Sequence, residues 1–146
     1  MTTELNDSLN ALLADYMVFY QKLRNYHWNV AGSEFFKLHE KFEEAYNEAS
    51  NIVDGLAERI LALDGHAYST LQDFVDNADL NEDPEVPSAE HMVENLVDDI
   101  ELLNDRVLEA VELAEQHGDR ATANLLDDVI DAQEERLWMF KTFLRK

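Results

Sequence analysis

The 146-residue sequence contains no cysteine, only two prolines and only four glycines. Without cysteine the chain forms neither a disulfide framework nor a thiolate metal site, so any metal ion has to be held by histidine, carboxylate or backbone oxygen. Basic residues are also scarce, since 11 Lys and Arg stand against 32 Asp and Glu and give a formal charge of −21. This balance argues against nucleic acid as a partner, because the chain has little positive charge to neutralise phosphates.

Long apolar runs are missing as well. No stretch is long enough to cross a bilayer, and the first residues, MTTELNDSLNALL, lack the basic start and apolar centre of a signal peptide. We therefore expect a soluble, cytoplasmic protein with no membrane partner. The length suits a single domain spanning residues 1–146 around one hydrophobic core.

Apolar residues recur at steps of three and four through four long segments, which is the spacing of one face of a helix. The sequence predicts helices over residues 5–30, 33–63, 89–118 and 119–144. Ser33 is placed to cap the second helix, and Asp64 and Gly65 are placed to end it. No segment shows the alternation typical of a strand.

The segment between residues 66 and 88 holds both prolines and predicts a long connection. Within it, residues 69–78 start with capping-type side chains and place Leu71, Phe74 and Val75 together, so we expect a short helix there. Two helical hairpins joined by one long crossover describe a ferritin-like bundle. The predicted fold class is all-α, a ferritin-like four-helix bundle with a short extra helix in the crossover between helices two and three.

Histidine and carboxylate side chains fall beside the apolar faces of the first two helices. His27 lies on the inward edge of the first helix, while His39 and Glu43, and again Asp54 and Glu58, are four residues apart on the second. Each pair therefore projects from one face and can bind a metal ion together. Since Glu43 and Asp54 are separated by about 16 Å of helix, one chain cannot bring both pairs to one ion. A compact site needs two copies of this helix crossing antiparallel about a two-fold axis, with two such sites per dimer.

The usual metal site of a ferritin-like bundle has a Glu three residues before a His on each of two helices. Here the residues three positions before the five histidines are Arg24, Phe36, Leu63, Ser88 and Ala114. A di-iron site inside one bundle is therefore disfavoured. A manganese catalase, which would need the same pairs, ranks last among the alternatives.

The stretch YHWNV, followed by a glycine, two aromatic residues, LHEKFEEAY and DGLAERI, resembles the Dps family, the "DNA-binding proteins from starved cells", also called mini-ferritins. The resemblance covers nearly the whole chain, including STLQDF and LWMFKTFL. It implies a homo-oligomeric shell of twelve subunits that oxidises Fe(II) at di-iron sites between subunits, with hydrogen peroxide favoured over oxygen. The ferric product would be stored as mineral inside the shell, which protects against oxidative damage.

Carried over residue by residue, the resemblance implies that one subunit supplies His27, His39 and Glu43 and that its partner supplies Asp54 and Glu58. These five residues would be both the iron ligands and the catalytic residues of a ferroxidase. Glu43 stands where the family commonly has Asp. The side chain of Glu is one methylene longer than that of Asp. This difference would change the geometry around the more weakly bound of the two iron ions.

The resemblance also implies roles outside this ligand set. Trp28 would lie beside the site as a redox-active aromatic, although a tryptophan is more often a packing residue. An iron-entry pore on a three-fold axis would be lined by acidic residues, which here are Glu115, Asp119, Asp128 and Asp131. DNA binding in the family uses a basic tail, and no Lys or Arg precedes Lys22, so DNA binding is not expected.

Two other interpretations of the same residues stay open. Asp54 or Glu58 could form a structural ion pair with Arg59, because ion pairs imitate functional sites. The polar residues could also only set the register of a non-catalytic helical oligomer. Such an oligomer would assemble but show no saturable oxidation of iron.

A solvated acidic surface that keeps a crowded protein soluble explains most of the negative charge. The excess of acidic side chains could also be an adaptation to a salty cytoplasm, and this hypothesis predicts that salt stabilises the folded protein. Screening of the charge of −21 should weaken self-repulsion, so we expect the thermal unfolding midpoint to rise from low to molar KCl. Circular dichroism during heating measures the midpoint. A constant or falling midpoint would contradict the hypothesis that the acidity is an adaptation to a salty cytoplasm.

Overall fold

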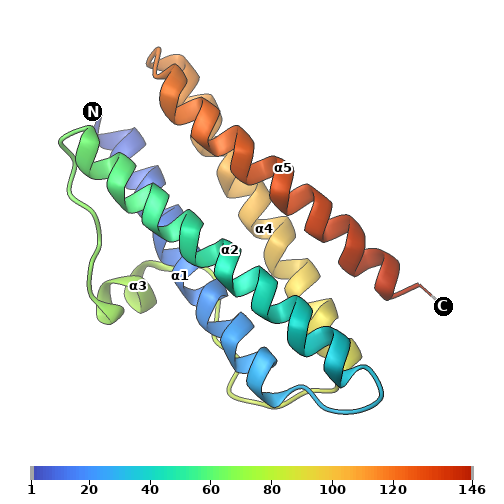
Figure 1. Ribbon diagram of the computed structural model, residues 1–146. Helices are drawn as coiled ribbons and strands as arrows, with labels where there is room; N and C mark the ends of the chain where they lie inside the picture. Colours follow the sequence, from blue (N-terminus) through green and yellow to red (C-terminus); the bar gives the residue numbers. More distant parts are fainter. Residues whose placement is uncertain (1, 146) are drawn as a thin grey trace.

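A computed structural model describes residues 2–145, and within them it contains five helices and no strand. The helices are α1 (Thr3–Asn29), α2 (Phe35–Ala62), α3 (Leu71–Asn77), α4 (Ala89–Gln116) and α5 (Arg120–Phe143). Figure 1 shows α1 and α2 as one antiparallel hairpin beside a second hairpin formed by α4 and α5. The predicted all-α bundle with a short extra helix is confirmed.

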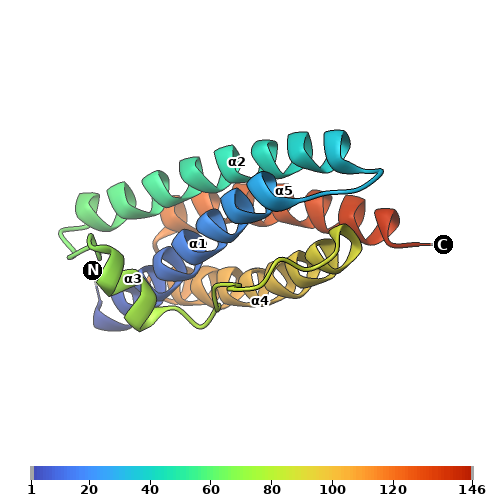
Figure 2. The ribbon, with the colours of Figure 1, turned by 90° about the horizontal axis from the view of Figure 1, so that it is seen from below.

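The connection between the two hairpins runs the length of the bundle. It leaves α2 at the end where α1 begins, carries α3 along the side of α1 and reaches the start of α4 at the opposite end (Figure 1). The view from below shows α3 outside the four long helices (Figure 2). Helices α2 and α4 therefore run in the same direction, as a single long crossover requires.

Capping side chains define where most helices begin. Backbone N–H groups near the starts of α1, α3, α4 and α5 donate to Thr2, Thr70, Ser88 and Asp119, respectively. Each bond satisfies a donor that the first helical turn leaves unpaired. The predicted cap at Ser33 is wrong, since Glu34 occupies the cap position of α2 without a capping bond. The turn at Gly32, with φ of 103°, bonds Phe35 N–H to the Gly32 oxygen and delays the helix.

The end of α2 depends on two residues with different tasks. Asp64 adopts the left-handed conformation, with φ of 60°, a role that sequence patterns usually give to glycine. Gly65 is needed for close approach, because an added β-carbon would clash with Oδ1 of Asn6 and lie 2.9 Å from a methyl carbon of Ile60. The turn therefore holds the end of α2 against the start of α1.

The four long helices share one apolar core. Helix α1 packs against α2, α3 and α4, and α4 packs against α5. The largest fully buried side chains include Tyr16, Phe19, Tyr26 and Phe42. Throughout residues 2–145, every helix is too short or too polar to serve as a membrane span.

Carboxylates hold the crossover on the bundle. Asp15 accepts hydrogen bonds from the backbone N–H groups of Asp79 and Leu80 at 2.6 and 3.1 Å. Farther along, the Tyr26 hydroxyl donates to Asp83 at 2.6 Å, and this bond is the main reason that the pKa of Asp83 is lowered. A segment without a regular backbone ladder needs such partners for its polar groups.

One buried ion pair links the two hairpins. Lys22 Nζ on α1 lies 2.8 Å from Oδ2 of Asp99 on α4, and the two side chains are 7% and 12% exposed. Burial raises the pKa of Asp99, and the bond from Lys22 offsets that rise only in part. Removing one member would leave the other polar group buried without its partner.

We expect Lys22→Met to lower the free energy of unfolding by about 3–5 kcal/mol, because Asp99 then lacks its partner. The double variant Lys22→Met, Asp99→Leu is the matched control and should recover most of the loss. Denaturant unfolding at a fixed protein concentration measures both, since assembly makes apparent stability depend on concentration. Equal losses in the single and double variants would contradict this account of the pair.

Candidate functional site

His27 and His39 meet where α1 ends and α2 begins. Their rings stack with centroids 3.7 Å apart and planes 15° apart. Nδ1 of His27 lies 2.6 Å from the backbone oxygen of His39, and Nδ1 of His39 lies 2.7 Å from the backbone oxygen of His27. A carbonyl oxygen only accepts, so each Nδ1 carries a proton, and in the neutral imidazole Nε2 keeps a lone pair for a metal ion.

The end of α1 explains this reciprocal arrangement. The backbone oxygen of His27 lies in the last turn of α1, where carbonyl groups lack a helical partner, and His39 supplies the missing donor. His27 is only 6% exposed, while His39 is half-buried. A hydrogen bond through one ring nitrogen fixes the orientation of the other, as it does in many metal-binding histidines.

Glu43 lies one turn beyond His39 on α2, and its carboxylate lies near the ring of His27. Its Oε1 is 3.7 Å from Nε2 of His27, and its side chain is 52% exposed. That separation is too long for a hydrogen bond, but it suits two ligands of one metal ion with bonds of about 2 Å each. The single chain therefore places Glu43 beside His27 and stacks His27 on His39.

Asp54 and Glu58 lie farther along α2, one turn apart, and both are exposed. Neither carboxylate forms a hydrogen bond or an ion pair within residues 2–145. In the same range, no three His, Asp or Glu side chains, the predicted ligands included, form a group that could hold a metal ion within one chain. The structure of one chain thus keeps the two halves of the predicted ligand set apart.

Arg59, the alternative structural partner of those carboxylates, is engaged elsewhere. Its guanidinium lies 3.0 Å from Oδ1 of Asp119 and donates to Oγ1 of Thr122 at 2.8 Å. Burial acts to raise the pKa of Asp119, but the bonds from Thr122 and the charge of Arg59 lower it overall. The interpretation of Asp54 or Glu58 as a structural partner of Arg59 is therefore wrong for this chain.

Comparison with known proteins agrees with this geometry. Residues 6–146 match the family model of the ferritin-like domain. A DNA protection during starvation protein from Brevibacillus brevis is 42% identical over 136 residues, which cover 93% of this chain and 91% of the relative. The crystal structure of Dps from Staphylococcus aureus superposes with a TM-score of 0.96 at 39% identity, covering 99% and 97% of the two chains. The chain belongs to the Dps family.

A second structure adds the chemical class of the family. Dps from Vibrio cholerae, 38% identical with a TM-score of 0.94, covers 97% of this chain and is described as a ferritin-like diiron-carboxylate protein. The chain covers 89% of that structure. The ferritin-like fold and the Dps resemblance are thus confirmed, and iron is the metal that the family supports.

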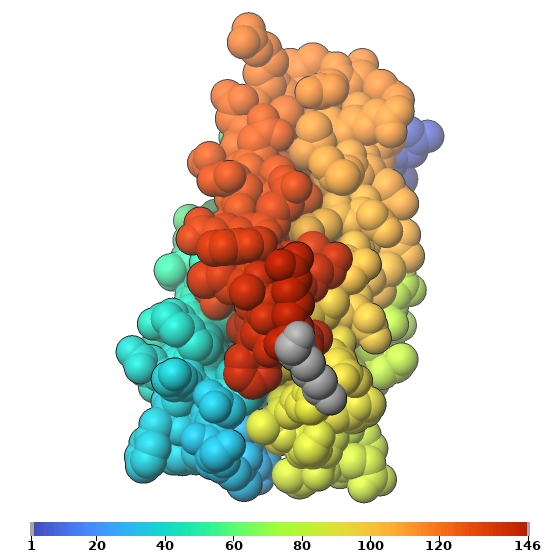
Figure 3. Space-filling view, turned by 90° about the vertical axis from the view of Figure 1, so that its right-hand side faces the viewer, coloured from blue at the N-terminus to red at the C-terminus, as the bar shows by residue number. Residues whose placement is uncertain are grey.

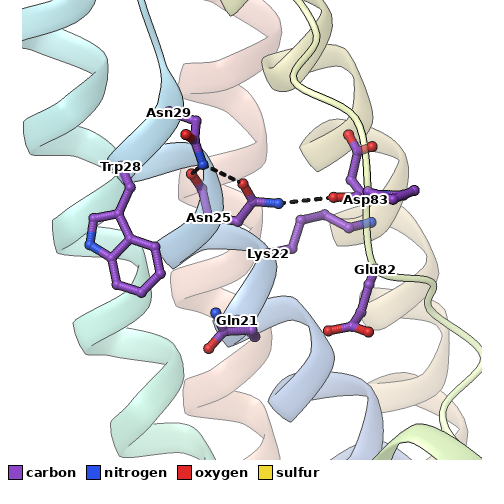
Figure 4. Close-up of a pocket in the computed structure, with 8 residues that line it drawn as sticks. Gln21, Lys22, Asn25, Trp28, Asn29, Glu82 and Asp83 are labelled. Carbon is purple, nitrogen blue, oxygen red and sulfur yellow. Dashed lines mark hydrogen bonds between the residues drawn. The ribbon is translucent and has the colours of Figure 1, made fainter.

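Trp28 follows His27 but does not contact the histidine rings in the described part of the chain. Its side chain is 57% exposed, and the Arg24 guanidinium lies 5.1 Å from its ring. Figure 4 shows the ring on the α2 side of α1, beside a hollow of about 540 Å³ that is walled on the other side by residues 82–84. None of the five predicted iron ligands lines this hollow.

The acidic residues predicted for an entry pore lie at the end of α4 and along α5, the helix that runs down the middle of the face in Figure 3. Glu115, Asp128 and Asp131 are exposed. Asp119 instead caps α5 and pairs with Arg59. The pore stays a prediction, because its walls would come from several subunits.

The aromatic neighbours of the histidine pair were not predicted from the sequence. Tyr46 meets the ring of His27 edge to face at 5.3 Å, and Phe35 stacks on His39 at 5.0 Å. Tyr46 follows Glu43 by three residues on α2, a spacing that places both on one side of the helix. That spacing is the feature of the sequence that could have indicated Tyr46 as a neighbour of the histidine pair.

Removing the charges of neighbouring residues on α2 should change the stability of the protein in opposite directions. We expect Asp54→Asn with Glu58→Gln to leave the thermal unfolding midpoint of the iron-free protein unchanged or slightly raised, because two unpaired negative charges leave a strongly acidic chain. Arg59→Met should lower the free energy of unfolding by about 1–3 kcal/mol, since Asp119 loses a charged donor. A clear loss of stability in the double variant would show that these carboxylates have a structural role.

Proposed function

We propose that this member of the Dps family is a ferroxidase and an iron store. It oxidises Fe(II), preferably with hydrogen peroxide, at di-iron sites between subunits and keeps the ferric product inside a shell of twelve copies. The observation that carries the proposal is the histidine pair. Its two Nδ1 hydrogen bonds direct both lone pairs to Nε2, and Nε2 of His27 lies beside Glu43.

The donor atoms on the chain suit iron as a substrate. Neutral imidazole and carboxylate oxygen both bind Fe(II), and the absence of cysteine removes the thiolates that select softer ions. His27, His39 and Glu43 form one half of the set. Five protein ligands do not fill the coordination spheres of two iron ions, so positions remain for the oxidant.

The other half of the set has to come from a second copy. Glu43 and Asp54 are separated by about 16 Å along one rigid helix. The carboxylates of Asp54 and Glu58 are exposed and have no partner within residues 2–145. An antiparallel crossing of two α2 helices would place Asp54 of the partner subunit and Glu58 of the partner subunit opposite the histidine pair. The same symmetry would create a second, identical site.

Two Fe(II) ions in one site can supply the two electrons that reduce hydrogen peroxide to water. Each Fe(II) gives one electron, so two Fe(II), one hydrogen peroxide and two protons yield two Fe(III) and two molecules of water. No hydroxyl radical leaves the site in this balance. The chain contributes by fixing the ligands beforehand, since the reciprocal histidine bonds hold both rings without iron.

Protection of DNA would follow from this chemistry rather than from binding. Relatives are named for DNA protection, but a charge of −21 on each chain repels phosphates. Lys22, the first basic side chain in the sequence, is buried against Asp99 and is not available to a partner. Removal of Fe(II) and peroxide takes away the two reagents that generate hydroxyl radical.

Two inactive variants should complement each other if each site is shared between subunits. One variant carries His27→Ala and His39→Ala, and the other carries Asp54→Asn and Glu58→Gln. In a mixed dimer, one of the two sites receives intact histidines from one chain and intact carboxylates from the other. Random pairing makes half of the dimers mixed, so we expect about a quarter of the wild-type activity.

The measurement is ferric absorbance after peroxide is added to anaerobic Fe(II) and the co-assembled protein. Each variant assembled alone is the control and should be nearly inactive, and wild-type oxidation should saturate near two irons per site. An inactive mixture would contradict the shared site. Full activity in both separate variants would contradict the assignment of these residues as ligands, whereas a wild type without saturable oxidation of iron would leave only the non-catalytic oligomer.

A further inference from the structure

Two tyrosines connect the histidine pair to the outer part of the α1–α2 hairpin. Tyr46 meets His27 edge to face, with centroids 5.3 Å apart and planes at 80°. Tyr20 meets Tyr46 in the same manner, at 6.0 Å and 90°. Both tyrosines are only partly buried. A continuous series of ring contacts therefore leads from a predicted iron ligand toward solvent.

Trp28 lies outside that series, although the family resemblance gives it the redox role. Within residues 2–145, the contact recorded for its ring is with the guanidinium of Arg24, and no ring contact joins it to His27, Tyr46 or Tyr20. Trp28 is 57% exposed and lines the hollow in Figure 4. In this structure the tyrosines are closer neighbours of the site than the tryptophan.

Arg24 lies among all three rings. Its guanidinium carbon is 5.1 Å from the centroids of Tyr46 and Trp28 and 5.6 Å from that of Tyr20. A fixed positive charge beside a ring favours the electron-rich neutral form and opposes a radical cation. A phenol avoids this cost when it releases its proton together with its electron. The hydrogen bond of 2.8 Å that Arg24 donates to the Tyr20 oxygen persists in the phenoxyl form, because that oxygen still accepts.

We propose that Tyr46, and after it Tyr20, supplies an electron when peroxide meets a site that holds a single Fe(II). This inference rests on the proposed ferroxidase function. One Fe(II) and hydrogen peroxide give Fe(III), hydroxide and a hydroxyl radical, because peroxide needs two electrons and receives one. Tyr46 donates the missing electron and its phenolic proton to that radical, which becomes water, and a neutral phenoxyl radical remains on Tyr46.

The contact between the tyrosines then moves the radical outward. Tyr20 gives an electron to Tyr46 and loses its phenolic proton to water, while Tyr46 takes up a proton and is restored. The chain has no cysteine that could be oxidised in their place. When a site holds one Fe(II), the two irons needed for the two-electron reaction are not present. Tyr46 and Tyr20 then supply the second electron.

Electron paramagnetic resonance on the assembled protein tests this assignment. Protein with ring-deuterated tyrosine receives one Fe(II) per site without oxygen, then peroxide, and is frozen. Deuteration alters the spectrum of a tyrosyl radical but not that of a tryptophanyl radical. We expect a tyrosyl signal in the wild type and its loss in Tyr46→Phe, which keeps the ring and its packing but has no phenolic proton.

Trp28→Phe and Tyr68→Phe are the matched controls and should keep the signal. Tyr68 is a half-buried tyrosine of the connection whose hydroxyl faces Asn77, away from the histidine pair. Hydroxyl radical captured by a spin trap in solution should increase in Tyr46→Phe and not in Tyr68→Phe. A signal that is insensitive to deuteration and disappears in Trp28→Phe would overturn the inference, as would a tyrosyl signal unchanged in Tyr46→Phe.

A parallel sample with two Fe(II) per site separates this inference from the proposed function. There we expect Tyr46→Phe to oxidise iron at the wild-type rate, since the two irons supply both electrons. If the wild type oxidises iron but forms no tyrosyl radical, only the inference is overturned. If the wild type oxidises no iron in either sample, the ferroxidase proposal and the inference fail together.

Discussion

The reciprocal hydrogen bonds between His27 and His39 are the interaction on which the candidate site depends. Each imidazole donates from Nδ1 to the backbone oxygen of the other residue, at 2.6 and 2.7 Å. One of these bonds satisfies a carbonyl group that the last turn of α1 leaves without a helical partner. The same two bonds select the tautomer, accompany the stacking of the rings and leave the lone pair of each neutral ring on Nε2. In the proposed site, one interaction would therefore both close the α1–α2 hairpin and prepare the histidines for metal binding.

The polar residues of helix α2 point in different directions, some toward the bundle and some toward solvent. Arg59 turns toward the bundle and joins α2 to the start of α5 through Asp119 and Thr122. Asp54 and Glu58, its close neighbours, stay exposed and make no bond within the part of the chain that the structure describes. Exposed carboxylates on a rigid helix cost the single chain little, because water solvates them. Their positions become informative when a second copy of the helix is considered.

Sequence reasoning predicted the elements well because helix periodicity is a local property. The predicted start of α4 at Ala89 agrees with the structure, and the short helix predicted over residues 69–78 is found at Leu71–Asn77. The interactions that were not predicted join distant residues. Lys22 and Asp99 are 77 positions apart, and the sequence does not show which helix faces will meet. The contact of Tyr46 with His27 also joins two helices, but the three-residue spacing of Tyr46 from Glu43 was a local indication of it. The left-handed Asp64 shows how a short polar side chain can replace a glycine.

The interior of the bundle shows why a metal site would have to lie at its surface. Buried polar residues near the middle of α1 and α5 include Tyr16, Gln133 and Arg136, and Arg136 pairs with Glu48 of α2 at 3.2 Å. Facing helices in this region hold the metal site of other ferritin-like bundles, but a permanent guanidinium charge opposes a divalent cation there. A divalent cation is therefore not expected between the facing helices of one chain. In the proposed arrangement, iron binds only after two copies meet, so the free energy of metal binding stabilises their association rather than the fold of each subunit.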